Sequence, residues 1–562
     1  MRLALALFAL VSAPVIAQPL DLPDAPPYVL TNATIYTVDE AAPTAEALAV
    51  SANGALAAVG TEAEVTAAYP TWPRVDAGGR TVIPGLIDAH AHLMGLGEAL
   101  LEADLMGTES VADVLSRLRE FGRDLPFGAW ITGRGWDQND WPARDDGSRP
   151  FPTRQQLDAL YANTPVVLMR VDGHALWANS EALRQAGIDP DFPAPEDPDG
   201  GQILRQSNGS PTGIFIDAAM DLVTRAVPAS SPERLREALA RATAETARHG
   251  LTGVHEAGIP LALLPLYEQA IEEGRFPLRN YAMLSMDELA TFCKQYPEGY
   301  PSNGRLRVQS LKVYSDGALG SRGAALIEDY SDDPGNTGLL FQDTETLTRI
   351  VTQAMNCGLQ VNSHAIGDRG NRAVLDAYET AMTTTGGGPG RHRIEHAQIM
   401  SLSDIERMAG LNIIASVQPT HATSDMPWAE DRVGPERIKG AYAWRRIVDA
   451  GARLALGSDF PVERVAPLLG FYAAVTRQDA EMNPAGGWYG NQALTREEAL
   501  RGFTLDAAFA GFMEHEVGSL ETGKRADFVV LSQDLMRVPP EQILATEVLA
   551  TVVDGAPVFV AE

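Results

Sequence analysis

Short runs of alternating apolar and polar residues occupy both ends of the chain. Residues 28–39, 46–60 and 73–88 show this alternation near the N-terminus, and residues 526–534 and 548–562 show it again near the C-terminus. Asn-Gly and Gly-Gly pairs interrupt the N-terminal runs, which is typical of turns between β-strands. The two ends are therefore predicted to pair into one β-sandwich domain made of residues 27–80 and 515–562.

The middle of the chain has a different pattern, in which stretches with helical periodicity alternate with short apolar runs. Such alternation is typical of βα units that build a parallel sheet. Eight candidate strands can be counted, at residues 81–90, 252–258, 279–286, 307–317, 359–368, 391–398, 412–419 and 453–462. Eight units predict a (β/α)8 TIM barrel over residues 81–514, with its active site at the C-terminal ends of the strands.

The connection after the first predicted strand is too long for a simple loop. Residues 93–251 contain helices and strands of their own, so this segment is predicted to be a cap inserted over the barrel mouth. Its stretch RGWDQNDW places Trp136 among polar groups, which suits either an exposed wall for a ligand or packing against the barrel.

The N-terminus has the pattern of a cleaved signal peptide. Arg2 precedes an apolar run at residues 3–12, and Ala17 provides the small residue at which cleavage is expected. We predict a signal peptide at residues 1–17 and an exported protein, periplasmic or secreted; a disordered apolar N-terminus is the alternative. Cys293 and Cys357 are the two cysteines, and both are predicted to be buried free thiols.

The net charge of the chain argues against two classes of binding partner. The chain carries 44 Lys and Arg against 74 Asp and Glu, a net charge of −30. A surface this acidic repels nucleic acid and anionic lipid, so neither is an expected partner. A small-molecule substrate is expected, and a homodimer is compatible with the sequence.

Residues suited to metal binding fall at the predicted ends of separate strands. Neutral imidazole and carboxylate groups bind zinc and similar divalent ions, and two histidines two residues apart can face one ion. The H-x-H pair alone is a weak signal, but further candidates follow the fifth, sixth and eighth strands, and a lysine lies on the fourth. The predicted ligands are His90, His92, Lys312, His364, His396 and Asp459.

These motifs resemble the amidohydrolase superfamily, and within it the amidohydrolase-3 (YtcJ-like) group, to which N-substituted formamide deformylase belongs. The resemblance covers residues 27–560 and is carried by PGLIDAHAHL, RVDGHALWANSEAL, LKVYSDGALGSRGA, HAIGDRGNRAVLDA, RIEHAQ, GSDFPV and GSLETGKRADFVVL. It implies a barrel joined to a β-sandwich, and a metal site with one or two ions, expected to be zinc. It also implies that Lys312 is carboxylated and bridges two ions; an ordinary lysine paired with an acid is the alternative.

The expected chemistry is hydrolysis of an amide or formamide-like C–N bond by a metal-activated water. Asp459 is expected to take the proton of this water and pass it to the leaving nitrogen. Two other hypotheses stay open: a deaminase of a cyclic amidine or aryl amine, and a non-catalytic exported binding protein that retains the barrel.

Further residues are candidates for contact with the substrate. His174 lies in the predicted cap and His421 follows the seventh strand, and each could instead make a local structural hydrogen bond. Asp316 and Arg322 follow Lys312 toward the mouth, where Arg322 suits either a substrate carboxylate or a neighbouring acid. With Trp136, these residues complete the predicted substrate-binding set.

Overall fold

The computed structural model describes residues 20–125, 128–144, 147–171, 173, 175–198 and 201–562. The predicted signal peptide lies outside the described residues. The chain forms two compact units: one combines the segment up to Ala91 with Ala244–Glu562, and the other is His92–Thr243.

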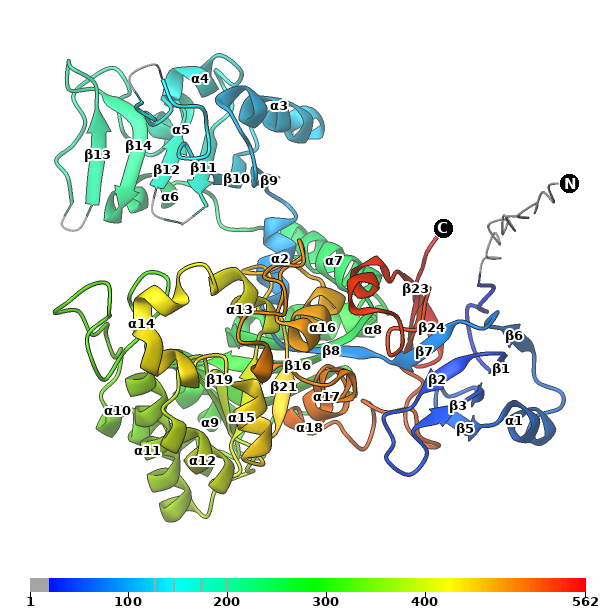
Figure 1. Cartoon of the computed structure of the whole chain (residues 1–562). Helices are drawn as coiled ribbons and strands as arrows, with labels where there is room; N and C mark the ends of the chain where they lie inside the picture. The colour runs from blue at the N-terminus through cyan, green and yellow to red at the C-terminus, as the bar shows by residue number, and fades with distance from the viewer. Residues whose placement is uncertain (1–19, 126–127, 145–146, 172, 174, 199–200) are drawn as a thin grey trace, which may run out of the picture. The chain divides into compact units, whose positions relative to one another are not determined.

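The larger unit contains an eight-stranded parallel sheet with the order β21-β20-β19-β18-β17-β16-β15-β8. Figure 1 labels β8, β16, β19 and β21 of this sheet. All eight strand segments predicted for the barrel contribute to it. The two terminal strands meet through a hydrogen bond from the amide of Asp459 to the carbonyl of His90, at 2.8 Å. The strands are β8 (Leu86–Ala91), β15 (Leu251–Ile259), β16 (Arg279–Ser285), β17 (Leu306–Tyr314), β18 (Gln360–Ala365), β19 (Arg393–His396), β20 (Ile414–Val417) and β21 (Leu454–Leu456).

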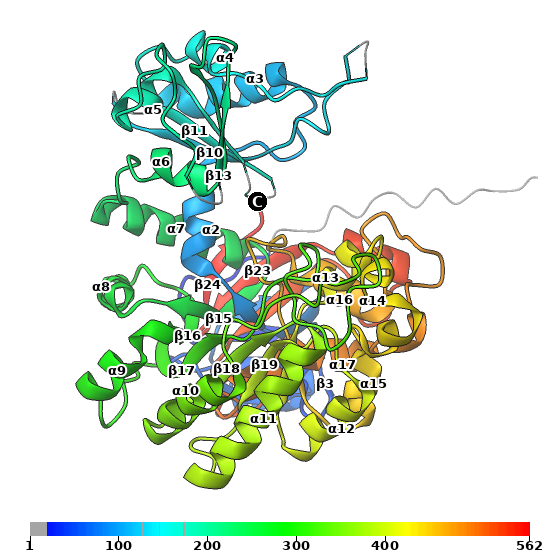
Figure 2. The same ribbon diagram turned by 90° about the vertical axis from the view of Figure 1, so that its left-hand side faces the viewer.

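Helices cover the outside of these strands, as Figure 2 shows for α9 to α12. In α10, for example, Asp343 caps the first turn by accepting a hydrogen bond from the amide of Thr346 at 2.7 Å, and an apolar face at helical spacing is buried. None of the described helices has the length and apolar character needed to cross a bilayer. The helices of the larger unit are α8 (Leu264–Glu272), α9 (Leu289–Gln295), α10 (Thr344–Asn356), α11 (Asp368–Thr385), α12 (Leu402–Gly410), α13 (Pro419–Asp425), α14 (Ala429–Arg437), α15 (Trp444–Asp449), α16 (Pro467–Thr476), α17 (Arg496–Gly502) and α18 (Leu505–Ala510). The boundary between the two units falls within α7 (Pro232–Arg248).

Both chain ends build two further sheets in this unit. One has the order β5-β4-β1-β6 and the other β24-β23-β22-β7-β2-β3, and a shared apolar core includes Tyr28, Leu48 and Phe528. The chain passes from β7 into the barrel strand β8 at Gly85, where an added Cβ would lie 2.2 Å from the Thr252 hydroxyl. The bounds are β1 (Tyr28–Thr31), β2 (Thr34–Tyr36), β3 (Thr44–Ala45), β4 (Ala47–Val50), β5 (Leu56–Gly60), α1 (Glu62–Ala68), β6 (Arg74–Asp76), β7 (Thr81–Pro84), β22 (Phe528–Leu531), β23 (Val548–Val553) and β24 (Ala556–Val560).

The smaller unit has its own six-stranded sheet and its own core. Trp136 is fully buried there: its indole N–H donates to the carbonyl of Leu168 at 2.9 Å, and its ring packs on Trp141 and Trp177. The expectation of an exposed ligand wall is therefore wrong for Trp136. The elements are α2 (Leu93–Ala99), β9 (Ala103–Asp104), α3 (Val111–Phe121), β10 (Ile131–Trp136), α4 (Arg154–Asp158), β11 (Val166–Arg170), β12 (Ala175–Ala178), α5 (Ser180–Gln185), β13 (Gly201–Arg205), β14 (Pro211–Asp217) and α6 (Asp221–Thr224).

The two cysteines form a disulfide, so the prediction of free thiols is wrong. Cys293 lies in α9 and Cys357 caps the C-terminus of α10, with 5.6 Å between their Cα atoms. That separation lies within the range that a disulfide spans. The cross-link joins the helices that precede and follow β17 in the chain. These two helices lie close together because successive βα units of a barrel pack side by side.

Candidate metal centre

Five of the six predicted metal ligands are positioned by barrel strands of the larger unit. His90 lies in β8, Lys312 in β17, His364 in β18 and His396 at the end of β19, while Asp459 follows β21. The ring centroids of His90 and His364 lie 4.9 Å and 4.6 Å from that of His396. Because parallel barrel strands present their C-terminal ends at one face, residues up to 369 positions apart in the chain come together there.

The polar atoms of this cluster are close enough to share one ion. One nitrogen from His90, one from His396 and one carboxylate oxygen of Asp459 lie within 4.8 Å of one another. Asp459 Oδ1 is 3.5 Å from His90 Nε2. The amine of Lys312 lies 3.0 Å from the same nitrogen of His90.

Neighbouring side chains fix the orientation of two of the imidazoles. His90 Nδ1 is bonded to the buried carboxylate of Glu395, and His396 Nδ1 lies 2.8 Å from Gln418 Oε1. A ring held in this way through Nδ1 presents Nε2 to a metal. The sequence analysis missed both Glu395 and Gln418, although a carboxylate inside the short, fully buried strand β19 was a signal that it has a partner.

Burial keeps the histidines neutral and makes Lys312 easier to deprotonate. Burial and the charge of Lys312 lower the pKa of His90 to about 4 and that of His364 to about 3. Burial likewise lowers the pKa of Lys312 to about 8. Neutral imidazole is the form that binds metal, and an unprotonated amine is the form that reacts with carbon dioxide.

The backbone at two ligands adopts a conformation that ordinary side chains rarely take. φ is +73° at His396 and +63° at Asp459. Such strain is retained when the surroundings enforce it, and it is concentrated at functional sites. A positive φ also interrupts the regular alternation of side chains along a strand, so the direction of these two side chains does not follow from the sequence pattern.

Hydrogen bonds to the side chain of Asp88 hold the turn in which Asp459 has its positive φ. The buried carboxylate of Asp88 accepts hydrogen bonds from the amide of His90 at 3.1 Å, and from the amide and hydroxyl of Ser458 at 3.0 Å and 2.6 Å. It therefore joins the end of β8 to the turn that carries Asp459.

The remaining predicted residues of the larger unit have distinct roles. His421, in α13, stacks on His396, and its Nε2 lies 3.8 Å from Asp459 Oδ2, so it belongs to the centre. Asp316 is buried and accepts hydrogen bonds from the amides of three residues in two loops, which indicates a structural role. Arg322 pairs with Asp332 at 2.9 Å. Of the two partners expected for Arg322, a substrate carboxylate or a neighbouring acid, the structure contains the neighbouring acid.

Two predicted residues cannot be placed at this centre. His92 is the residue before α2, at the start of the smaller unit, two positions after His90. It stays a predicted ligand. His174 lies outside the described residues.

The chemistry of the donor set fits a divalent ion. Among the described residues, the buried Nε2 atoms of His364 and His421 have no hydrogen-bond partner. A buried polar atom without a partner is unfavourable, and coordination of a cation satisfies a neutral imidazole nitrogen. Three imidazoles and a carboxylate from separate strands are ligands that zinc and related ions accept.

Comparison with known proteins assigns the chain to a family. The family model described as "Amidohydrolase family" matches residues 74–559. The chain belongs to the amidohydrolase family. This confirms the resemblance drawn from the motifs, and makes the chain a member of a hydrolase family.

Amidohydrolase relatives cover nearly the whole length of the chain. The putative amidohydrolase YtcJ of Bacillus subtilis (strain 168) is 34% identical over 536 residues, which are 93% of this chain and 98% of that protein. N-substituted formamide deformylase of Arthrobacter pascens is 31% identical over 545 residues, 94% and 97% of the two chains. The crystal structure of an uncharacterized metal-dependent hydrolase from Pyrococcus horikoshii OT3 has a TM-score of 0.76 and 28% identity, and covers 91% of this chain and 99% of that one.

Proposed function

We propose that this amidohydrolase is metal-dependent and hydrolyses a C–N bond in a small amide or formamide-like substrate. The observation that carries the proposal is the convergence of His90, His364, His396 and Asp459 from four strand ends, with imidazole nitrogens oriented or left available for a cation. Two relatives, a putative amidohydrolase and a formamide deformylase, support the same bond class.

The proposed ion, expected to be zinc, would be held by these four side chains; His92, two positions after His90, stays a predicted ligand. When bound, such an ion lowers the pKa of water and polarises the scissile carbonyl. Asp459 accepts the proton of the attacking water and returns it to the leaving nitrogen. One of its oxygens approaches His90 and the other approaches His421, so the carboxylate is held between two imidazoles.

Lys312 is proposed to be carboxylated, in which case two ions are expected; an amine at Lys312 and one ion are the alternative. The lowered pKa of its buried amine supports this, because the unprotonated amine is the reactive form. Incubation with ¹³C-labelled bicarbonate and metal should give a carbamate signal in ¹³C NMR. The signal should be absent in Lys312→Ala; a spectrum without it in the wild type would favour a lysine that stays an amine and a single ion.

A substrate screen with a matched variant tests the proposed reaction. N-formyl, N-acyl and aryl amides would be assayed for release of the amine, and cyclic amidines and aryl amines for release of ammonia. Asp459→Asn should lower kcat by about 10²- to 10⁴-fold, the usual contribution of a general base. Asp376→Asn, which alters a half-exposed ion pair with Arg407, is the control and should retain full activity. Ammonia release without amine release would contradict the amide assignment.

We also propose that the chain is exported and acts on a small molecule. The N-terminal pattern of residues 1–17 supports export, and so does the Cys293–Cys357 disulfide, because such bonds persist in oxidising compartments. The net charge of −30 argues against nucleic acid or an anionic membrane as the partner. The mass of the mature protein from the periplasm or medium should correspond to a chain that begins at Gln18 with its disulfide intact; a full-length cytoplasmic product would contradict the proposal.

A further inference from the structure

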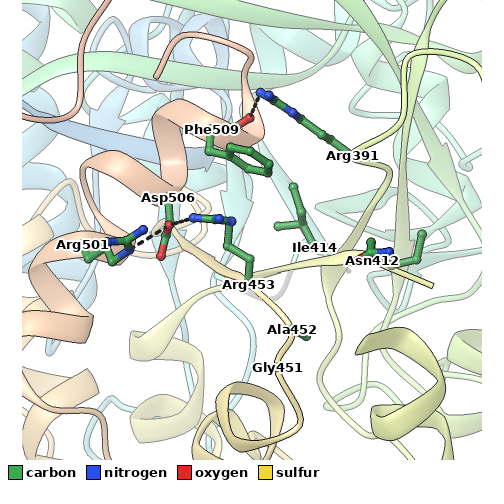
Figure 3. A pocket seen from close by; sticks show the side chains of 10 residues that line it. Arg391, Asn412, Ile414, Gly451, Ala452, Arg453, Arg501, Asp506 and Phe509 are labelled. Carbon is green, nitrogen blue, oxygen red and sulfur yellow. Dashed lines mark hydrogen bonds and ion pairs between the residues drawn. The ribbon is translucent and has the colours of Figure 1, made fainter. Parts of the chain in front are cut away.

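A cavity lies at the opposite end of the barrel from the metal ligands. It has a volume of about 420 Å³ and is lined by residues that include Arg391, Asn412, Arg453, Arg501 and Phe509 (Figure 3). Arg453 immediately precedes β21, whereas Asp459 follows that strand. Six residues of nearly extended chain span about 20 Å, so the cavity is separate from the catalytic centre.

The lining of this cavity contains more basic than acidic residues, unlike the chain as a whole. Three arginines and one acid, Asp506, line it, although the chain as a whole carries a net charge of −30. By contrast, another cavity, beside α11, has a charged lining of Asp376, Glu379 and one arginine, Arg407. Each of these guanidinium groups pairs with an acid, so binding of an anion here would depend on the donors that the ion pairs leave unused.

The three arginines are held in place but keep hydrogen-bond donors in reserve. Arg453 bonds Asp506 through Nη1, and Arg501 bonds Asp506 and Glu40 through Nε and Nη1. Arg391 bonds Glu514 and the carbonyl of Phe509 through Nη1 and Nη2. Among the described residues, Nε and Nη2 of Arg453, Nε of Arg391 and Nη2 of Arg501 make no hydrogen bond, and these atoms are called the reserve donors below. These donors match the oxygens of a carboxylate or phosphate.

The cavity also has an apolar wall. The guanidinium carbons of Arg391 and Arg453 lie 3.8 Å and 4.0 Å from the ring centroid of Phe509, and Ile414 lines the same cavity. These contacts pre-position the two guanidinium groups, which lowers the entropy lost when a ligand binds. The volume is within the range of small-molecule sites.

We propose that this cavity, defined by Arg391, Asn412, Arg453, Arg501, Asp506 and Phe509, binds a small organic oxyanion, either a carboxylate or a phosphate monoester. This inference does not rest on the proposed catalytic activity. The oxyanion bonds the reserve donors of the arginines, and its organic part packs beside Phe509 and Ile414.

Isothermal titration calorimetry of the full chain with inorganic phosphate and with benzoate, at constant ionic strength in chloride, tests the proposal. The wild type should show one saturable site for at least one of the two probes, and the better probe identifies the type of oxyanion. Asn412→Asp adds a negative charge without removing an ion pair, because the exposed Asn412 side chain makes no hydrogen bond among the described residues. It should weaken binding by about tenfold.

Arg453→Gln removes two reserve donors and should also weaken binding by about tenfold, whereas the control Arg407→Gln should bind as the wild type does. If Arg453→Gln fails to fold, Asn412→Asp decides the question. Absence of saturable binding of both probes to the wild type, or equal binding by wild type and Asn412→Asp, would overturn the proposal.

Discussion

Replacement of either disulfide cysteine should destabilise the barrel unit by a predictable amount. The cross-link closes a loop with a sequence separation of 64 residues, and the chain-entropy model assigns about 4 kcal/mol to a loop of that length. At about 2.1 cal/mol/K per residue, unfolding of the larger unit, about 400 residues in the mature chain, has an entropy of about 0.8 kcal/mol/K. The Tm should therefore fall by about 5 °C.

Differential scanning calorimetry of Cys293→Ser, Cys357→Ser and the double variant measures this effect. All three should show the same decrease in Tm, because each change removes the same cross-link. Metal content would be matched between samples, since a bound ion also raises the Tm. A Tm equal to that of the wild type, or decreases that add up in the double variant, would refute the entropic argument.

Three further predictions concern the metal centre and its surroundings. Burial raises the pKa of Asp88 from 3.8 to about 7, so the folded chain loses stability as the pH rises from about 4 to about 7, and the loss levels off above that. In metal-depleted protein, the Tm of Asp88→Asn relative to that of the wild type should therefore increase between about pH 4 and about pH 7. A difference in Tm that stays constant over this range would contradict the assignment. Glu395→Gln removes the carboxylate that orients the His90 ring, so it should weaken metal affinity about 10- to 100-fold in a chelator competition. The control Glu379→Gln, at a half-exposed ion pair, should have the metal affinity of the wild type. Arg322→Gln removes a partly exposed ion pair worth about 1 kcal/mol or less, so KM for neutral amides should change less than about twofold; a rise confined to acidic substrates would instead assign Arg322 to a substrate carboxylate.

Most of the barrel was predictable because its hydrophobic pattern is local. Each of the seven strands from β15 to β21 is a short apolar run between helical segments, and seven such runs in succession leave few alternative topologies. The ends of the strands also carry the metal-ligand residue types, so His90, His364, His396 and Asp459 could be identified before their distances were known.

The errors and omissions concern contacts that no local pattern encodes. The pairing of Cys293 with Cys357 depends on two helices from successive βα units. Trp136 stands among polar residues in the chain but faces the core of a separate sheet. Glu395 orients His90 across 305 positions, and Asp88 could be explained only when its partner Ser458, 370 positions away, was seen beside it.

The transition-metal content of the purified chain tests the central claim most directly. Elemental analysis by inductively coupled plasma mass spectrometry should find at least one equivalent per chain, and His364→Asn should lower it, while His249→Asn, a partly exposed histidine paired with Glu245, should not. Less than one equivalent in the wild type, after reconstitution with zinc, would contradict a metal-dependent centre.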